Sequence, residues 1–227
     1  MVFTFHDDAG VEHLELKGES FKYLIKVRRH QEGDILALRQ GENPEILCHY
    51  RVENIDGRRA FLQLEKSEVK VVRASQELHI GWCIIDPKSI EKVLPLLNES
   101  GVNKITFITC KRSQKNFRLD FERYERLLDV SSQQCGRCEK MLFDTMSSSE
   151  EFLQKYPQTA IFDFGGKNLE NTQDIKTILV GCEGGFSKEE RELFDTNNLF
   201  SLKTPMILRS ETAVVAISNI LLLYTSH

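Results

Sequence analysis

The sequence predicts an α/β protein in two parts, a small β-rich unit followed by a larger unit in which strands and helices alternate. Short segments of alternating polar and apolar residues, separated by glycines, fill residues 1–72. From residue 73 to residue 227, apolar strand-like runs alternate with helical patterns. A chain of 227 residues that is 41% apolar and 28% charged is long enough to bury two modest cores, and this composition excludes wholesale disorder.

The N-terminal unit is expected to form a compact barrel. Strands this short bury a core most readily by closing on one another. A short amphipathic helix at Ser20–Val27 interrupts them, and glycines mark the turns between them. The expected strands are Val11–Leu16, Asp34–Arg39, Glu45–Val52 and Ala60–Leu64.

The second unit is expected to be a mostly parallel sheet with helices on both faces, because strands and helices alternate along it. Gly101 ends the first helical pattern, and Ser187 is the expected N-cap of a later one. Residues 147–149 are expected to form a loop, and Leu202–Arg209 a strand-like stretch that runs into the last helix. The expected strands are Leu78–Ile85, Lys104–Thr109, Ala160–Phe164 and Thr177–Gly181, and the expected helices are Ser89–Glu99, Phe121–Gln134, Ser187–Phe194 and Ser210–Tyr224.

Basic residues gather in two clusters although the formal net charge is -4 at pH 7. The net charge excludes a uniformly basic nucleic-acid binder, but the field at a local site depends on clustering. A solvated surface would explain one such cluster. Because there are two, a polyanion partner and a solvated surface are equally favoured interpretations. The first cluster contains Lys22, Lys26, Arg28 and Arg29, and the second contains Lys111, Arg112, Lys115 and Arg118.

The six cysteines are expected to be reduced thiols. The N-terminus shows no signal peptide, and no apolar stretch approaches the roughly 20 residues that span a bilayer, so a cytoplasmic protein is expected. Only Cys135-Gly136-Arg137-Cys138 has close spacing. Because this pair closes a helical pattern instead of opening one, and because a second pair is missing, redox chemistry and structural zinc are disfavoured. No metal is expected.

Two segments of the second unit suggest a ligand site. Gly181–Ser187 follows a strand, and its three glycines allow a sharp turn and a close approach of backbone to a ligand. The segment is neither a P-loop nor a dinucleotide fingerprint, and a simple strand-to-helix turn explains it equally well. Leu202–Ala213 leads into a helix whose first turn holds Arg209 and Glu211. The alternative interpretation of this segment is a surface ion pair between Arg209 and Glu211.

The order of these motifs along the chain resembles the RsmE family, which belongs to the SPOUT superfamily of methyltransferases. The resemblance implies S-adenosylmethionine-dependent methylation of N3 of a uridine in the 16S ribosomal RNA of the small ribosomal subunit. It also implies a PUA-like RNA-binding barrel over residues 1–72, a SPOUT domain with a deep trefoil knot over residues 73–227, and a homodimer with active sites at the subunit interface. The motifs are Val27–Asp34, Lys111–Ser113, Gln134–Arg137, Gly181–Ser187 and Ile207–Ala213.

The resemblance implies roles for individual residues. Arg209 and Arg137 would lie near the reacting base, Arg112 would contact a neighbouring phosphate or base, and Glu211 would either orient an arginine or accept the N3 proton. Backbone groups that would hold the cofactor belong to Val180, Gly181, Glu183, Gly184, Gly185, Leu202, Ile207 and Leu208. RNA contacts are expected from Lys26, Arg29, Lys111, Arg112, Lys115 and Arg118.

The sequence departs from the family pattern in the loops. Cys182 and Phe107 stand in place of prolines, Lys111 in place of glutamate, and Thr204 and Met206 in place of glycine and arginine. Two alternative functions stay open: a non-catalytic RNA-binding protein, and a ribose 2′-O-methyltransferase of the same superfamily. The apolar run between residues 214 and 222 is consistent with burial within the subunit or with a dimer built across this helix.

Overall fold

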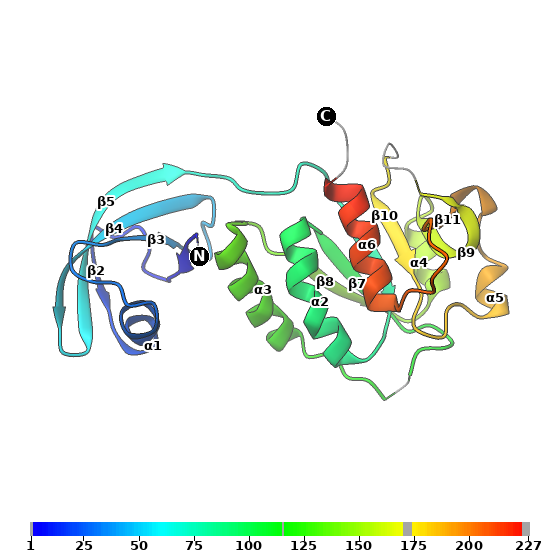
Figure 1. The fold of residues 1–227 in the computed structure, drawn as a ribbon, viewed down its shortest axis with the longest axis horizontal. Coiled ribbons are helices and arrows are strands. Elements are labelled where there is room, and N and C mark those ends of the chain that lie inside the picture. The colour runs from blue at the N-terminus through cyan, green and yellow to red at the C-terminus, as the bar shows by residue number, and fades with distance from the viewer. Residues whose placement is uncertain (1, 115, 170–173, 224–227) are drawn as a thin grey trace. The chain divides into compact units, whose positions relative to one another are not determined.

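The chain divides into two compact units, each with its own hydrophobic core. The computed structural model describes residues 2–114, 116–169 and 174–223 (Figure 1). The predicted boundary after residue 72 lies one residue before the observed division. The segment 132–139, which sequence order places in the second unit, groups with the first. The first unit is Met1–Arg73 with Ser132–Glu139, and the second is Ala74–Ser131 with Lys140–His227.

The first unit is built on a curved five-stranded sheet (Figure 1). The strand order is β1-β3-β4-β5-β2; β1 and β3 are parallel and the other neighbours are antiparallel. The pairing of β4 with β5 shifts register at His49/Tyr50 and at Val52/Asn54, and such bulges bend a sheet. The four predicted strands are present, and β4 and β5 are longer than predicted. The strands are β1 (Thr4–Phe5), β2 (His13–Leu16), β3 (Ile35–Arg39), β4 (Ile46–Asp56) and β5 (Arg59–Val69).

The helix predicted at Ser20–Val27 has an unexpected geometry. One α-helical turn, α1 (Gly18–Phe21), continues as a π-helix, η1 (Lys22–Val27). Leu24 is buried in the core of this unit, as the amphipathic pattern predicts. Two residues beyond η1, Arg29 takes a left-handed backbone conformation with φ 62°, which ends the helix.

The second unit contains a six-stranded sheet in which every neighbouring pair of strands is parallel, as predicted. Its order is β11-β9-β10-β6-β7-β8. The prediction of a strand-like stretch at Leu202–Arg209 is wrong. The strand β11 ends just before it, and residues 202–209 form a loop. This loop includes Pro205, which has no N–H to donate to a neighbouring strand. The strands are β6 (His79–Cys83), β7 (Lys104–Ile108), β8 (Leu142–Met146), β9 (Ala160–Asn168), β10 (Thr177–Val180) and β11 (Leu199–Ser201).

Helices cover both faces of this sheet, as predicted. On β6, Gly81 faces the helix α4, where the ring of Phe152 leaves only 2.5 Å for a Cβ atom. The next residue, Trp82, donates from Nε1 to Ser210 Oγ of the helix α6 over 2.9 Å. Because successive strand residues point to opposite faces, α4 and α6 lie on opposite faces. The helices are α2 (Pro87–Ser100), α3 (Phe121–Cys135), α4 (Ser149–Lys155), α5 (Lys188–Arg191), the 3₁₀ turn η2 (Thr196–Asn198) and α6 (Ser210–Leu223).

Capping residues fix the ends of several helices. The helix α2 ends at Gly101, whose φ of 101° is left-handed, as the sequence predicts. Ser187 caps α5 through a capping box with Glu190, although α5 itself is shorter than the predicted Ser187–Phe194. Ser148 caps α4, so a helix begins inside the expected loop at residues 147–149.

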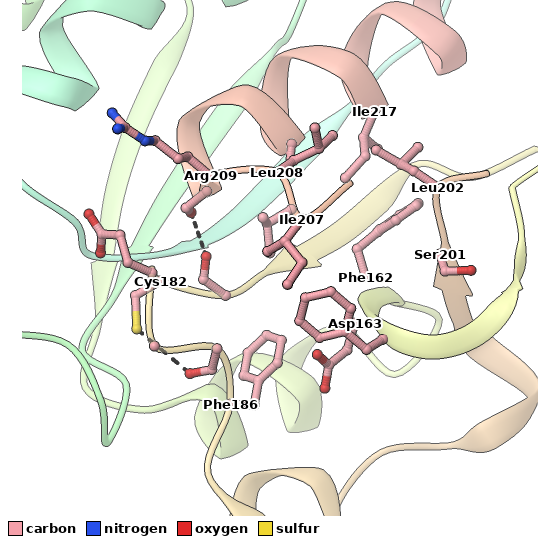
Figure 2. A pocket seen from close by; sticks show the side chains of 18 of the residues that line it. Phe162, Asp163, Cys182, Phe186, Ser201, Leu202, Ile207, Leu208, Arg209 and Ile217 are labelled. Atoms are coloured by element: carbon pink, nitrogen blue, oxygen red, sulfur yellow. Dashed lines mark hydrogen bonds between the residues drawn. The ribbon is translucent and has the colours of Figure 1, made fainter. Parts of the chain in front are cut away.

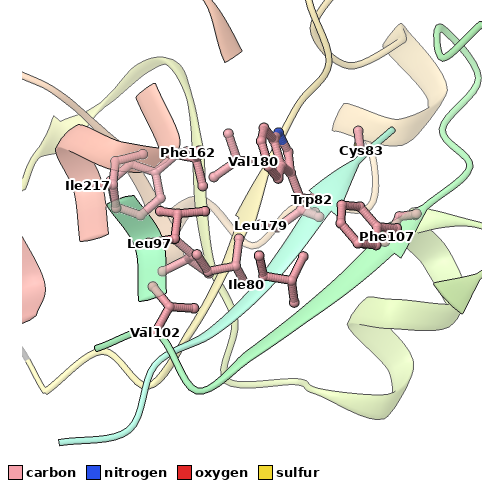
Figure 3. Packing of buried hydrophobic residues seen from close by; sticks show 14 of the residues in the cluster. Ile80, Trp82, Cys83, Leu97, Val102, Phe107, Phe162, Leu179, Val180 and Ile217 are labelled. Carbon is pink, nitrogen blue, oxygen red and sulfur yellow. The ribbon is translucent and has the colours of Figure 1, made fainter. Parts of the chain in front are cut away.

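The core of the second unit lies between the central strands and the helices α2 and α6 (Figure 3). Ile80, Trp82, Leu97, Phe107 and Leu179 are all fully buried there. Burying a side chain of this size stabilises the folded state by about 1.5–3 kcal/mol. This packing holds the carboxyl ends of β7 and β10 in register, and residues that follow these ends, Arg112 after β7 and residues 181–186 after β10, line the site described below.

Two cysteines form a disulfide, in contrast to the expectation of reduced thiols. Cys83 ends β6 and Cys110 follows β7, and their Cα atoms lie 5.6 Å apart. The parallel pairing of β6 with β7 brings together two residues separated by 27 positions, which sequence spacing does not reveal. Cys135 and Cys138, the closely spaced pair, are free thiols.

Candidate cofactor site and its flanking basic segment

Residues 162–164 of β9, the end of β11 and the loops that follow β10 and β11 line a cavity of about 490 Å³ (Figure 2). In open parallel sheets this edge is where ligands bind, and the volume is typical of a small-molecule site. All eight residues predicted from the sequence to hold a cofactor line this one cavity. They are Val180, Gly181, Glu183, Gly184, Gly185, Leu202, Ile207 and Leu208.

The interior of the cavity is largely apolar. Figure 2 shows Phe162, Phe186 and Ile207 around it, with Leu202 and Ile217 on the side of α6. Phe186 is buried, whereas Ile207 is 81% exposed. Aromatic and branched side chains arranged in this way can pack against the faces of a flat heterocycle.

The glycine loop, residues 181–187, is held in a tight turn. Gly185 has a φ of 63°, and its N–H donates to the carbonyl of Cys182 over 2.9 Å. At Gly184 a Cβ atom would lie 3.3 Å from the side chain of Arg112, so a larger residue there would displace its neighbours. Ser210 Oγ donates to the Gly181 carbonyl over 2.5 Å and joins the loop to α6.

The basic segment after β7 contacts the glycine loop directly. Arg112 Nη1 donates to the carbonyl of Gly184 over 2.7 Å, and Arg112 is a lining residue of the cavity. The N–H of Lys111 donates to Glu190 Oε1 over 3.1 Å, and its Nζ lies 3.4 Å from Glu189 Oε2. The structure therefore places Arg112, predicted to contact RNA, against the predicted cofactor loop.

Glu190 joins three segments around the glycine loop. Its carboxylate is buried and accepts hydrogen bonds from Ser187 N at 2.7 Å, from Ser149 Oγ at 3.2 Å and from Lys111 N at 3.1 Å. A buried carboxylate is tolerated when its oxygens are satisfied in this way. The site analysis from sequence missed Glu190, and the spacing of Ser187 and Glu190, which is that of a capping box, is the signal that could have found it.

Arg209 lies at the margin of the cavity just before α6 (Figure 2), and Glu211 lies in the first turn of that helix. The Arg209 side chain is 83% exposed, and its Nη1 lies 4.0 Å from Glu211 Oε1. Glu211 is 19% exposed. An exposed pair at this distance contributes little to stability, so the guanidinium remains available to a ligand.

Arg137 lies elsewhere, in the segment 132–139 of the first unit. It is buried at 4% exposure, and this burial lowers the pKa of its guanidinium. Arg137 does not line the cavity formed by the described residues of the second unit. Arg137 and the two predicted catalytic residues at the start of α6 therefore belong to different units.

The other predicted RNA contacts are exposed where they are described. Lys26 and Arg29 are exposed at the end of η1 and just beyond it, and Lys26 Nζ lies 5.5 Å from the ring centre of Phe21. Arg118 is exposed after β7. Lys115 lies outside the described residues.

One polar pair in the cavity wall has no sequence signal. Arg191 of α5 donates from Nε and Nη2 to the two carboxylate oxygens of Asp163 in β9, over 2.5 and 3.1 Å. The Asp163 side chain is only 6% exposed, and its carboxylate raises the pKa of Arg191. The two residues lie 28 positions apart, so only the fold pairs them.

No group of three or more metal-ligating side chains is arranged for a metal ion within residues 2–114, 116–169 and 174–223. Among the helices of the same residues, none combines the length and the apolar character needed to cross a membrane.

The fold and cavity define an α/β protein with a small-molecule site at the carboxyl edge of a parallel sheet, flanked by basic residues. Residues 72–222 match a family model described as an RNA methyltransferase domain. The chain belongs to this RNA methyltransferase family.

Curated relatives narrow the comparison. The chain is 34% identical over 224 residues to the ribosomal RNA small subunit methyltransferase E of Helicobacter pylori, covering 97% of this chain and 99% of the relative. It is 26% identical over 223 residues to the protein of the same name from Aquifex aeolicus, covering 85% of this chain and 96% of the relative. The RsmE resemblance inferred from the motifs is confirmed.

Solved structures share the fold. A ribosomal RNA small subunit methyltransferase E from Neisseria gonorrhoeae bound to S-adenosylmethionine superposes with a TM-score of 0.73 at 17% identity, covering 96% of this chain and 97% of that one. A probable rRNA-methyltransferase from Porphyromonas gingivalis gives 0.75 at 22% identity, covering 96% of both chains.

Proposed function

We propose that this protein uses S-adenosylmethionine to methylate N3 of a uridine in the 16S ribosomal RNA of the small ribosomal subunit, uridine 1498 by family resemblance. The observation that carries the proposal is the convergence of all eight predicted cofactor residues on one cavity with Arg209 at its margin. The names of the relatives, and the cofactor bound to the Neisseria gonorrhoeae structure, support the same reaction and the same cofactor.

The cavity fits the proposed cofactor. Its apolar interior suits adenine, and the backbone of residues 181–186 offers N–H and carbonyl groups to the polar parts. At Gly184 the absence of a Cβ atom keeps the backbone accessible beside Arg112. When bound, S-adenosylmethionine supplies an electrophilic methyl group.

The residues at the margin of the cavity suit the chemistry of uridine. N3 is a neutral imide nitrogen and becomes a good nucleophile only when it loses its proton, which spreads negative charge onto the two flanking carbonyl oxygens. Arg209 is permanently charged and presents paired donors, so it can stabilise that charge. Glu211, 4.0 Å from Arg209, can orient the guanidinium or accept the N3 proton.

Arg137 is proposed to lie near the reacting base, as the family resemblance implies. It belongs to the segment 132–139 of the first unit and is 4% exposed. Lys26, Arg29, Lys111, Lys115 and Arg118 are proposed to bind RNA phosphates.

The finer features of fold and assembly are part of the same proposal. The first unit would be a PUA-like RNA-binding barrel, the loops 181–187 and 202–209 would belong to a SPOUT trefoil knot, and the protein would act in the cytoplasm. A homodimer is proposed across α6. Val214, Ile217, Leu221 and Leu222 are buried within the subunit, whereas Val215 and Ile220 are only partly buried and Leu223 is 60% exposed.

Nucleoside analysis tests the function. Small subunits from a strain lacking the protein are incubated with the protein and S-adenosylmethionine, and the 16S ribosomal RNA is digested for mass spectrometry. We expect 3-methyluridine. A ribose-methylated nucleoside would establish the 2′-O-methyltransferase alternative, and RNA binding without cofactor binding in calorimetry would establish the non-catalytic alternative.

Variants at the start of α6 separate the proposed roles there. Arg209→Ala should lower turnover by about 10²–10³-fold while S-adenosylmethionine affinity changes little, because the guanidinium acts on charge that develops on the base. If Glu211 accepts the proton, Glu211→Gln should remove one limb of the pH–rate profile; if it orients Arg209, turnover should fall at every pH. Arg209→Ala with wild-type turnover would contradict the assignment.

A further inference from the structure

The pair Asp163–Arg191 lies in the wall of the cavity and has no role in the mechanism above. Asp163 stands at the carboxyl-terminal side of the buried part of β9, directly after Phe162. Figure 2 shows it beside Phe162 and Phe186, at the apolar interior of the cavity. A carboxylate with a 6% exposed side chain in such surroundings is costly unless its oxygens are engaged.

Arg191 engages both oxygens and still leaves acceptor capacity. Its Nε and Nη2 donate to Oδ2 and Oδ1 of Asp163. A carboxylate has about four acceptor sites, so about two remain for a ligand. Because the guanidinium already balances the charge, these sites favour neutral O–H donors over a second cation.

The position of the pair indicates which donor it would meet. Arg191 Nη2 is 3.7 Å from where a Cβ atom of Gly185 would lie, so the pair borders the glycine loop on one side and the apolar interior on the other. The group of an adenosine ligand that joins the heterocycle to its remaining polar part is the ribose, with two neighbouring hydroxyls. An acidic side chain near the end of a parallel strand is a recurrent acceptor for ribose hydroxyls.

We propose that Asp163 accepts hydrogen bonds from the ribose hydroxyls of the adenosine-containing cofactor, and that Arg191 positions its carboxylate. The inference rests on the proposed function, because it takes S-adenosylmethionine as the ligand of this cavity. The competing explanation is an ion pair that only braces α5 against β9. If Asp163 contacts the ribose, its replacement weakens the binding of a ligand that has the hydroxyls more than the binding of one that lacks them. An ion pair that only braces α5 predicts no such difference.

Calorimetry with S-adenosylhomocysteine and its 2′-deoxy and 3′-deoxy analogues tests the proposal. For the wild-type protein at least one deoxy analogue should bind about tenfold more weakly, since a hydrogen bond to a charged group is lost. In Asp163→Asn this difference should shrink to about twofold. Arg191→Gln is the matched control: it breaks the same ion pair but keeps the carboxylate, so discrimination against the deoxy analogue should persist although the melting temperature falls.

Several results would overturn the inference. Equal binding of the three ligands by the wild-type protein rejects it without any variant, and so does discrimination that survives in Asp163→Asn. If the loss of affinity in Asp163→Asn disappears with 5′-methylthioadenosine, which lacks the amino-acid end, the contact is to the ammonium group instead. Failure of the wild-type protein to bind S-adenosylhomocysteine at all overturns the proposed function as well. Should Asp163→Asn not fold, equal binding of the three ligands by the wild-type protein still rejects the inference.

Discussion

The two loops that line the cavity are held in different ways. The glycine loop, residues 181–187, is fixed by groups from outside it: Ser210 at Gly181, Arg112 at Gly184 and Glu190 at Ser187. The loop 202–209 bonds back to itself, with Thr204 N donating to the Leu202 carbonyl and Met206 N to Thr204 Oγ1. The first loop is therefore preorganised for a ligand.

The two loops also differ in how much of their side chains is exposed. Met206 is 67% exposed, Ile207 is 81% exposed, and the Arg209 side chain is 83% exposed, whereas Phe186 in the glycine loop is buried. Exposed apolar side chains next to an apolar cavity gain burial only when a ligand arrives. The comparison teaches that the glycine loop is a fixed surface and the loop 202–209 an exposed one. In the proposed function the first would hold the cofactor, and the second would close over it and carry the arginine proposed to meet the base.

The largest expected effect comes from placing a larger side chain in the glycine loop. Gly184→Val should lower S-adenosylmethionine affinity by about 100-fold or more, because even its Cβ atom would lie 3.3 Å from Arg112 and its methyl groups would occupy ligand space. Calorimetry measures the affinity, and circular dichroism checks that the protein stays folded. Gly41→Val is the control, since a Cβ atom there meets nothing within 4 Å. Unchanged affinity in Gly184→Val would reject the glycine loop as the cofactor surface.

Fold and site were predictable to different extents from the sequence. Periodicity identified β6, β7, β10, α2 and α3 because buried residues recur there at a constant spacing. It did not identify β8, an edge strand whose first residue, Leu142, is 62% exposed, so the pattern of a buried strand is missing. It placed a strand on residues 202–209 because apolar residues there face a cavity and not a core.

Residues that act through their own backbone were predicted best. The glycine spacing of the 181–187 segment is a local signal, and all the predicted cofactor positions line one cavity. Pairs that the fold creates have no such signal: Asp163 with Arg191, and Cys83 with Cys110. The burial of Arg137 had no signal in the sequence either, because a basic side chain is normally expected at the surface.

A smaller effect is expected from a variant that weakens RNA binding and leaves the cofactor loops intact. Replacing Lys111, Lys115 and Arg118 with serine should weaken RNA binding by about tenfold and reduce the salt slope by roughly 0.7–0.9 per lost phosphate contact. S-adenosylmethionine affinity should stay within about twofold, because Lys111 holds Glu190 through its backbone N–H, which serine keeps. Filter binding over a salt series measures both quantities. An unchanged RNA affinity and slope would identify the cluster as a solvated surface.

The smallest effect is expected in the exposed loop. Ile207→Ala should change the free energy of unfolding by less than about 0.5 kcal/mol, because the side chain is 81% exposed without ligand. It should nevertheless weaken S-adenosylmethionine binding several-fold, since the ligand would cover that side chain. Denaturant unfolding and calorimetry give the two values. A large loss of stability with unchanged cofactor affinity would reverse the roles assigned to the two loops.

Hydrogen–deuterium exchange with and without S-adenosylmethionine tests the contrast between the two loops most directly. Without cofactor, amides in residues 181–187 should exchange more slowly than those in residues 202–209, because Ser187 N donates to the buried Glu190 carboxylate and Gly185 N to the Cys182 carbonyl in a tightly held loop. On addition of the cofactor, the account predicts strong new protection in residues 202–209 and a smaller change in residues 181–187. Protection confined to other parts of the chain, or an equal change in both loops, would contradict it.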